Sequence, residues 1–129
     1  MSSRGILALA AIFGATGVAA GAFGAHALAN RLSAADLAIF ETAARYQMYH
    51  AVALLGLGAW IDRRPSPRLS WAARLWIAGI LVFSGSLYLL VLTQLRWLGA
   101  ITPFGGTAMI LGWVLLAVDA IRSTPKASH

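Results

Sequence analysis

The chain has 129 residues, enough for one domain. Hydrophobic residues make up 60% of it and charged residues only 11%. A soluble domain uses about a quarter of its residues as charged groups to cover its surface, so a soluble globular domain is excluded and much of the exterior must face lipid. The net charge of +6 lies in the gaps between apolar runs. It therefore indicates membrane topology and anionic headgroups rather than nucleic acid. The absence of cysteine excludes disulfides, thiolate metal sites and a cysteine nucleophile.

Four apolar runs predict an all-α membrane protein, with four transmembrane helices in a compact bundle forming one domain over residues 1–129. The expected spans are 6–28, 45–61, 74–94 and 103–121. At 1.5 Å per residue the first run crosses a hydrocarbon core of roughly 30 Å, whereas the second uncharged run reaches only about 24 Å. A cleaved signal peptide is the alternative for the first run, but the apolar core of a signal is only about 7–15 residues long.

Capping residues predict where the helices begin. Ser33 and Asp36 fit a capping pattern that opens a helix running to about Trp60, so residues 34–45 would lie at the membrane interface ahead of the second span. The prolines at 65 and 67 predict a loop, followed by a third helix that Ser70 could cap. Thr102 precedes a proline at the first position of the fourth helix. Residues 122–129 form a C-terminal tail.

The distribution of basic residues predicts the orientation. With four spans, the N-terminus, the loop around residue 65 and the C-terminus share one side, which holds seven of the ten basic residues. The positive-inside rule then places both termini in the cytoplasm. Aromatic belts are expected at the two interfaces, an inner one of Trp60, Trp71 and Trp76 and an outer one of Tyr46, Tyr49 and Trp97.

A stripe of glycines in the first helix predicts close helix packing. Gly14, Gly17, Gly21 and Gly24 are spaced three or four apart, and the middle two form a GxxxG pair that allows two backbones to approach. The expected partners are the third helix around Gly85 and the fourth helix at Gly105, Ala108 and Gly112. The alternative is a substrate path lined by exposed backbone.

Polar residues near the first two spans form the candidate functional site. Placing such residues in a membrane costs free energy, so each is expected to have a structural or functional role. The cluster comprises His26, Glu41, Thr42, Arg45, Tyr46, Gln47 and His50. Glu41 and Arg45 are four apart with the acid first, the favourable order for a helical ion pair. Tyr46 and His50 are also four apart and share one helix face.

Three interpretations of this cluster compete. The first is a hydrogen-bonded clasp between the first two helices. The second is a metal or haem site that uses His26 and His50, but the histidines lack the spacing of an HxxxH motif. The third is a proton or solute relay, because histidine titrates near neutral pH. No metal or cofactor is assigned.

Other polar groups favour structural roles. Asp119 lies three residues before Arg122 and is expected to pair with it at the interface. Tyr88 lies within the third span and needs a partner for its hydroxyl group, so it should face the interior. No catalytic motif of a hydrolase, metalloprotease or nucleotide-binding protein is present, which favours a protein that is not an enzyme.

Several segments resemble the signature of the family known as domain of unknown function 423. They are residues 21–28 (GAFGAHAL), 40–51 (FETAARYQMYHA), 83–88 (FSGSLY), 101–106 (ITPFGG) and 112–113 (GW). The resemblance implies a multi-pass protein of the bacterial inner membrane and no particular activity. It marks His26, Glu41, Thr42, Tyr46, Gln47 and His50 as motif positions without giving them roles.

The favoured function is an accessory or interaction protein in the lipid bilayer that packs against itself or a larger membrane complex. The glycine stripe and the lack of a continuous polar path support it. A small oligomeric transporter or channel that uses the polar cluster is one alternative. A metal or haem binder through His26 and His50 is the other.

Overall fold

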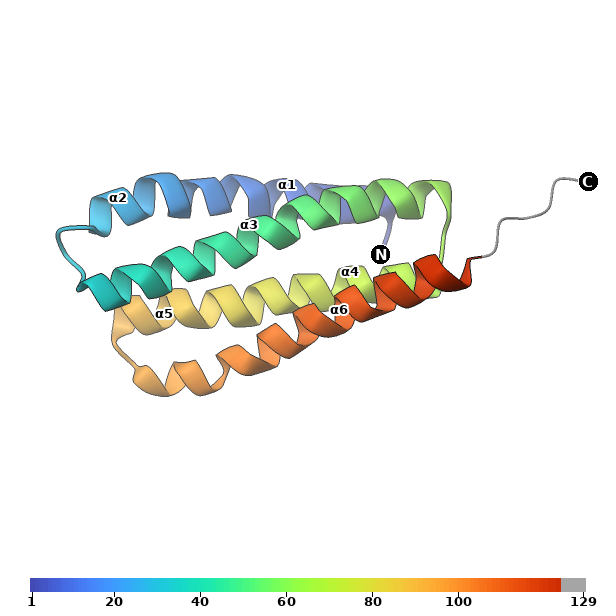
Figure 1. Ribbon diagram of the computed structural model, residues 1–129. Coiled ribbons are helices and arrows are strands. Elements are labelled where there is room, and N and C mark those ends of the chain that lie inside the picture. Colours follow the sequence, from blue (N-terminus) through green and yellow to red (C-terminus); the bar gives the residue numbers. More distant parts are fainter. Residues whose placement is uncertain (124–129) are drawn as a thin grey trace, which may run out of the picture.

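A computed structural model describes residues 1–123, and within them the chain forms four long antiparallel helical rods (Figure 1). The first rod is α1 (Ser3–Val18), a π-helical segment (Ala19–Gly24) and α2 (Ala25–Leu28). The second is α3 (Ala34–Arg63). The third is α4 (Pro67–Gly79), a second π-helical segment (Ile80–Ser84) and α5 (Gly85–Thr93). A 3-10 turn (Arg96–Ala100) and α6 (Thr102–Arg122) form the fourth.

The helix starts follow from capping chemistry. Ser33 caps α3 as predicted, because its hydroxyl oxygen accepts a 3.1 Å hydrogen bond from the backbone N–H of Asp36. The third rod begins earlier than Ser70, directly at Pro67, with Ser66 as its N-terminal flanking residue. Proline fits the first helical position because its missing N–H would have no intrahelical partner there.

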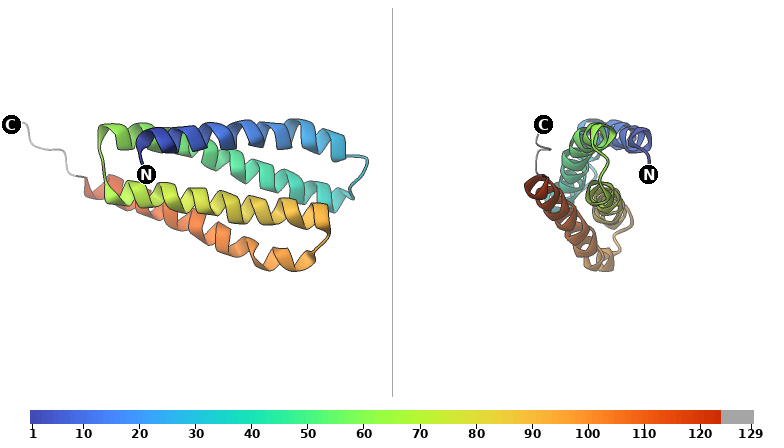
Figure 2. Two further views of the ribbon diagram at one scale, coloured as in Figure 1. Left: turned by 180° about the vertical axis from the view of Figure 1, so that it is seen from behind. Right: turned by 90° about the vertical axis from the view of Figure 1, so that its right-hand side faces the viewer.

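The four rods form an open array, so the prediction of a compact bundle is corrected. Within residues 1–123, α1 packs extensively only on α3, and α6 packs mainly on α4 and the π-helical segment that follows it. The two pairs join where α3 contacts α4 and α5. The view along the helices shows α1 and α6 at opposite ends of this array (Figure 2).

Small residues set the two extensive contacts. Gly17, Gly21 and Gly24 all face α3, where a Cβ atom on Gly17 would lie 2.5 Å from Sδ of Met48. The partner of the glycine stripe is therefore the second rod. The sequence-based prediction of the third and fourth helices as partners is wrong. A Cβ atom on Gly14 or on Gly85 would meet no atom of the described chain within 4 Å.

The contact between α4 and α6 is the closer of the two. A Cβ atom on Gly105 would collide with the backbone of Phe83, and one on Gly112 would lie 2.5 Å from the Trp76 indole. Trp76 is completely buried and donates a hydrogen bond to the carbonyl oxygen of Met109. It belongs to the core, which corrects its predicted place in an aromatic belt. Trp71, by contrast, is 55% exposed.

Three of the rods are long and apolar enough to cross a membrane: Ser3–Leu28, Pro67–Thr93 and Arg96–Arg122. The outer surface carries large apolar side chains, among them Phe104 and Ile121, which are 74% and 82% exposed. The 30 residues of α3 contain charged and polar groups that lower its hydropathy, and its membrane crossing stays a prediction. The predicted tail from residue 124 lies outside the described residues.

Candidate functional site

The predicted polar residues of α3 point in two directions. Gln47 and His50 are buried, each with 5% of its surface exposed. Glu41 and Arg45 lie on an exposed face of the same helix. The hydroxyl group of Thr42 donates to the carbonyl oxygen of Ala38, so this bond stays within α3 and does not join two rods. The sequence cluster is therefore split between the interior and the surface.

Gln47 joins three rods. Its Nε2 donates hydrogen bonds to the carbonyl oxygen of Phe13 (2.9 Å) and to Oγ1 of Thr16 (2.8 Å), both on α1. The hydroxyl group of Tyr88 on α5 donates to Oε1 of Gln47 over 2.8 Å. The prediction that Tyr88 faces the interior is confirmed. Sequence reasoning missed Thr16, whose only signal was a hydroxyl group in the first apolar run.

A cavity of about 230 Å³ lies beside this junction. It is bordered by α1, α3 and the second π-helical segment, and its lining residues are Phe13, Thr16, Gln47, Ile80, Leu81, Ser84, Gly85 and Tyr88. The hydroxyl group of Ser84 donates to the carbonyl oxygen of Ala43 over 2.7 Å and so ties the π-helical segment to α3. The cavity is mainly apolar, with one amide and three hydroxyl groups on its wall.

His50 forms a second junction, and both of its ring nitrogens have partners. Nδ1 lies 2.8 Å from the carbonyl oxygen of Tyr46, and Nε2 lies 3.0 Å from the indole Nε1 of Trp113 on α6. The carbonyl oxygen can only accept and the indole N–H can only donate. The imidazole is therefore neutral, with its hydrogen on Nδ1. The ring also packs edge-on against Trp76, with centroids 5.9 Å apart.

His26 lies far from His50. Gly24 faces Phe40 and Gly17 faces Met48, which fixes the antiparallel register of the first two rods. In this register His26 is level with about Ala38, roughly 18 Å along the axis from His50 at 1.5 Å per residue. His26 is exposed, whereas both nitrogens of His50 are engaged. The hypothesis of a shared metal or haem site is therefore wrong, and residues 1–123 contain no group of three histidine or acidic side chains suited to a metal.

Glu41 and Arg45 border a surface cleft between α1 and α3. The cleft has a volume of about 350 Å³ and is lined by Gly17, Gly21, Glu41, Ala44, Arg45 and Met48. The two charged groups do not form the helical ion pair that their spacing allowed, and neither belongs to any ion pair of the described residues. Tyr46 lies on another face of α3, where its ring packs against Phe83 at 5.0 Å between centroids.

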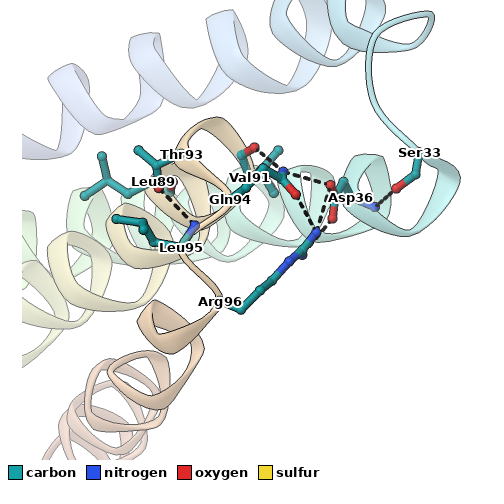
Figure 3. Close-up of polar contacts among 8 residues, drawn as sticks. All are labelled: Ser33, Asp36, Leu89, Val91, Thr93, Gln94, Leu95 and Arg96. Atoms are coloured by element: carbon teal, nitrogen blue, oxygen red, sulfur yellow. Dashed lines mark hydrogen bonds and ion pairs between the residues drawn. The ribbon is translucent and has the colours of Figure 1, made fainter.

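An ion pair fastens each end of the array. At one end the carboxylate of Asp36 accepts hydrogen bonds from the guanidinium group of Arg96 (2.9 and 3.2 Å) and from Nε2 of Gln94 (3.0 Å) (Figure 3). These bonds, with those from Arg96 contributing most, hold the pKa of Asp36 below its usual value. They connect the start of α3 to the turn after α5, where Gln94 adopts a left-handed conformation with φ of 60°.

At the other end Asp119 on α6 is 97% buried and pairs with the loop between α3 and α4. Its carboxylate accepts hydrogen bonds from Arg64 and from the hydroxyl group of Ser66, the latter over 2.6 Å, and Arg68 lies 3.8 Å away. The predicted pair of Asp119 with Arg122 is therefore wrong. The loop supplies the partners because it lies directly beside the last turn of α6 (Figure 1).

Comparison with known proteins identifies the family. The model of the family described as "Protein of unknown function (DUF423)" matches residues 20–106. The chain belongs to this family. The UPF0382 inner membrane protein YgdD of Escherichia coli K12 is 43% identical over 130 residues, which cover 100% of this chain and 99% of the relative. A UPF0382 membrane protein of Staphylococcus saprophyticus is 49% identical over 105 residues, or 81% of this chain and 87% of the relative. No solved structure matches.

The family resemblance and the membrane location predicted from sequence are confirmed. This DUF423 protein is a multi-pass inner-membrane protein, since YgdD is named an inner membrane protein, the staphylococcal relative is named a membrane protein, and three of its rods suit a membrane crossing. Neither the family description nor the names of these relatives includes an enzymatic activity. The matched region contains Gln47, His50 and Tyr88 but ends before Trp113.

Proposed function

We propose that this protein is a non-catalytic interaction protein of the inner membrane, which packs against itself or a larger membrane complex. The observation that carries this proposal is the open array of rods. Because α1 packs extensively only on α3, one side of α1 and the adjoining side of the third rod stay free of other described parts of the chain. A helix from a partner could occupy this space, which a closed four-helix bundle would lack.

The interior supports a structural role. Within residues 1–123, no buried side-chain nitrogen or oxygen atom lacks a hydrogen-bond partner. The junctions of Gln47 and His50 involve different rods, the first α1 and α5 and the second α6. Polar groups used in this way hold helices together. A conduction path would instead require a row of polar groups that remain available to a passing ion or solute.

We also propose that α3 crosses the membrane, giving four spans with both termini in the cytoplasm. Its 30 residues extend about 45 Å, which is the thickness of a bilayer with its headgroups. The N-terminus, the loop between α3 and α4 and the end of α6 lie at one end of the array (Figure 1), and most basic residues flank them in sequence. The positive-inside rule favours this end as the cytoplasmic one.

The natural absence of cysteine allows a direct test of this topology. Single variants Ser3→Cys, Asn30→Cys, Ser70→Cys and Gly99→Cys would be labelled in intact cells with a maleimide that cannot cross the inner membrane. The proposed topology predicts labelling of Asn30→Cys and Gly99→Cys only. Labelling of all four or of the opposite pair would contradict it.

Photo-cross-linking in native membranes tests the interaction role. Leu81 borders the cavity beside the open side of the array and is 61% exposed, whereas Ile121 is 82% exposed at the far end of α6. With a photoreactive amino acid at position 81, we expect a discrete protein adduct whose mass identifies a second copy or another protein. The same amino acid at position 121 is the matched control. Lipid adducts alone at both positions would contradict the proposal.

A small oligomeric transporter is the second candidate, favoured by the cavity beside Gln47 with its amide and hydroxyl groups. It predicts solute flux into liposomes that contain the purified protein. The variant Gln47→Met would reduce this flux without changing the amount of protein inserted. Absence of flux for a broad panel of ions and small solutes would leave the interaction role.

A further inference from the structure

We propose that the cleft between α1 and α3 binds the headgroup of a zwitterionic phospholipid with a primary amine, its phosphate on Arg45 and its ammonium group on Glu41. This inference does not depend on the proposed interaction role. It rests on the geometry of one surface cleft, on two charged side chains that border it and on the proposed membrane crossing of α3.

Glycine creates the space for a ligand. The cleft of about 350 Å³ is hollowed where Gly17 and Gly21 of the first rod face Ala44 and Met48 of α3. Larger side chains on the first rod would fill it, since a Cβ atom on Gly17 already overlaps Met48. The floor is apolar and suits the glycerol and upper acyl carbons of a lipid. The charged groups stand on one wall, both from α3.

The charges of the cleft need partners from outside the described chain. The other three acidic side chains already have them, because Asp36 pairs with Arg96, Asp62 accepts from Ser3 and Asp119 pairs with Arg64. Glu41 and Arg45 take part in no ion pair of residues 1–123, although they lie four apart on one helix.

Their depth makes this absence significant. At 1.5 Å per residue, Glu41 and Arg45 lie about 10 and 16 Å below the start of α3. If the length of α3 spans the bilayer with its headgroups, the hydrocarbon begins roughly 7 Å from each end, so Arg45 sits below the headgroup level. A charge at that depth is costly without a partner. A snorkelling arginine side chain would reach upward and meet a phosphate group near the boundary.

The order of the two charges selects the headgroup. In a phosphoethanolamine lipid, the phosphate is attached to glycerol and the ammonium group lies further from the acyl chains. Along α3, the cation Arg45 is the deeper group and the anion Glu41 is one turn closer to the aqueous end. Both charges of the headgroup are thus matched in sign and in their order along the membrane normal. A phosphoglycerol headgroup would offer Glu41 hydroxyl groups but no positive charge, and a trimethylated amine could not donate a hydrogen bond to it.

Native mass spectrometry of the detergent-purified full-length protein provides the test. Phosphatidylethanolamine, phosphatidylglycerol and phosphatidylcholine with identical acyl chains are titrated separately. We expect the dissociation constant for phosphatidylethanolamine to be roughly tenfold lower than for the other two, the size of one hydrogen-bonded charge pair. Glu41→Gln should abolish this preference, and Arg45→Gln should weaken binding of all three lipids. Arg31→Gln, which removes an exposed charge at the same end of the array, should leave the preference unchanged.

A charge-exchanged variant separates the lipid from a second copy of the chain. Glu41→Arg combined with Arg45→Glu reverses the depth order and should lose the preference for phosphatidylethanolamine. In a symmetric dimer through the cleft, the same exchange would keep each acid opposite a base. A dimer that is lost in both single variants and restored in the exchanged one would overturn the proposal. Equal affinity for the three lipids, or a preference unaffected by Glu41→Gln, would also overturn it. Melting temperatures of the variants close to that of the wild type would verify that they fold.

Discussion

The indole nitrogen of Trp113 donates a hydrogen bond of 3.0 Å to Nε2 of His50 and so connects α6 to α3. The backbones of α3 and α6 are not packed closely against each other, since α6 packs mainly on α4 and the π-helical segment that follows it. The opposite nitrogen of the imidazole is occupied by the carbonyl oxygen of Tyr46. His50 therefore acts as a fixed, neutral bridge between the two halves of the array and has no nitrogen left for a metal.

This bridge predicts a measurable coupling between the two side chains. Trp113→Phe and His50→Leu should each destabilise the protein, and together they should cost less than the sum of the single changes. Hydrogen bonds in membrane proteins average about 0.6 kcal/mol in such cycles and reach about 1.7 kcal/mol. Unfolding in mixed micelles measures the coupling, with Trp97→Phe on the exposed surface as control. Strict additivity of the two changes would show that the bond contributes nothing.

The ion pair of Asp36 and Arg96 predicts that the stability of the protein depends on pH in the acidic range. Because the bonds from Arg96 and Gln94 lower the pKa of Asp36 in the folded protein, the unfolded chain binds a proton more readily. The stabilisation is therefore fully present above the usual aspartate pKa of about 3.9 and is lost as the pH falls through the lower folded value.

A melting-temperature series from pH 7 down to pH 2 would reveal this effect. We expect the wild type to exceed Asp36→Asn by a constant margin at neutral pH, and the margin to shrink in acid below about pH 4. Asp62→Asn is the matched control, because within residues 1–123 this carboxylate is bonded only to the Ser3 hydroxyl group. A margin that stays unchanged down to the lowest pH would contradict an ionised Asp36.

Composition and capping chemistry predicted the class of protein and the limits of its second helix. The share of charged residues excludes a soluble domain. Ser33 indicates the start of α3 because its hydroxyl group accepts a hydrogen bond from a backbone N–H only three residues away. Tyr88 was also predictable, since a buried hydroxyl group requires a partner. Each of these inferences depends on the residue itself or on neighbours within one helical turn.

Pairings between rods were not predictable in the same way. The spacing of Gly17 and Gly21 indicated a close approach but could not identify α3 as the partner, because any helix can fill such a groove. Sequence spacing favours Arg122, one helical turn away, as the partner of Asp119, yet in the structure Asp119 pairs with Arg64, which is 55 residues away in sequence. The sequence groups His26 and His50 in one polar cluster because a short loop joins their helices, whereas the antiparallel register places them on different levels.

Gly105 provides a sharp test of the contact between the third and fourth rods. A Cβ atom there would overlap the backbone nitrogen of Phe83 and lie 2.8 Å from its Cα atom, and backbone cannot move aside as a side chain can. Gly105→Ala should therefore cost about 1–3 kcal/mol, the usual range for overpacking. Gly106→Ala is a matched control, because its Cβ atom would meet the Phe83 ring at an ordinary 3.6 Å. Equal unfolding free energies for the two variants would contradict the close approach.

The hydrogen bonds of the Gln47 amide predict that Gln47→Glu, which has nearly the same shape, destabilises the protein more than Gln47→Met does. Its Nε2 donates to Phe13 and Thr16, so Gln47→Glu would replace the donor with an oxygen atom facing two other oxygens and add a buried charge. Gln47→Met keeps the volume and should cost only about 1–3 kcal/mol for the polar groups left without partners. Adding Tyr88→Phe to Gln47→Met should cost little more, because the tyrosine hydroxyl group has by then lost its acceptor.

Melting temperatures of these variants in one detergent, with Thr42→Val as a surface control, give the ranking. If Gln47→Glu were as stable as Gln47→Met, water would have to reach the carboxylate through the adjoining cavity of about 230 Å³. A hydrated cavity at that depth would favour the transporter over the interaction protein, because solutes would then have polar surroundings inside the array. A strongly destabilised Gln47→Glu variant would instead identify the junction as a dry clasp between α1, α3 and α5.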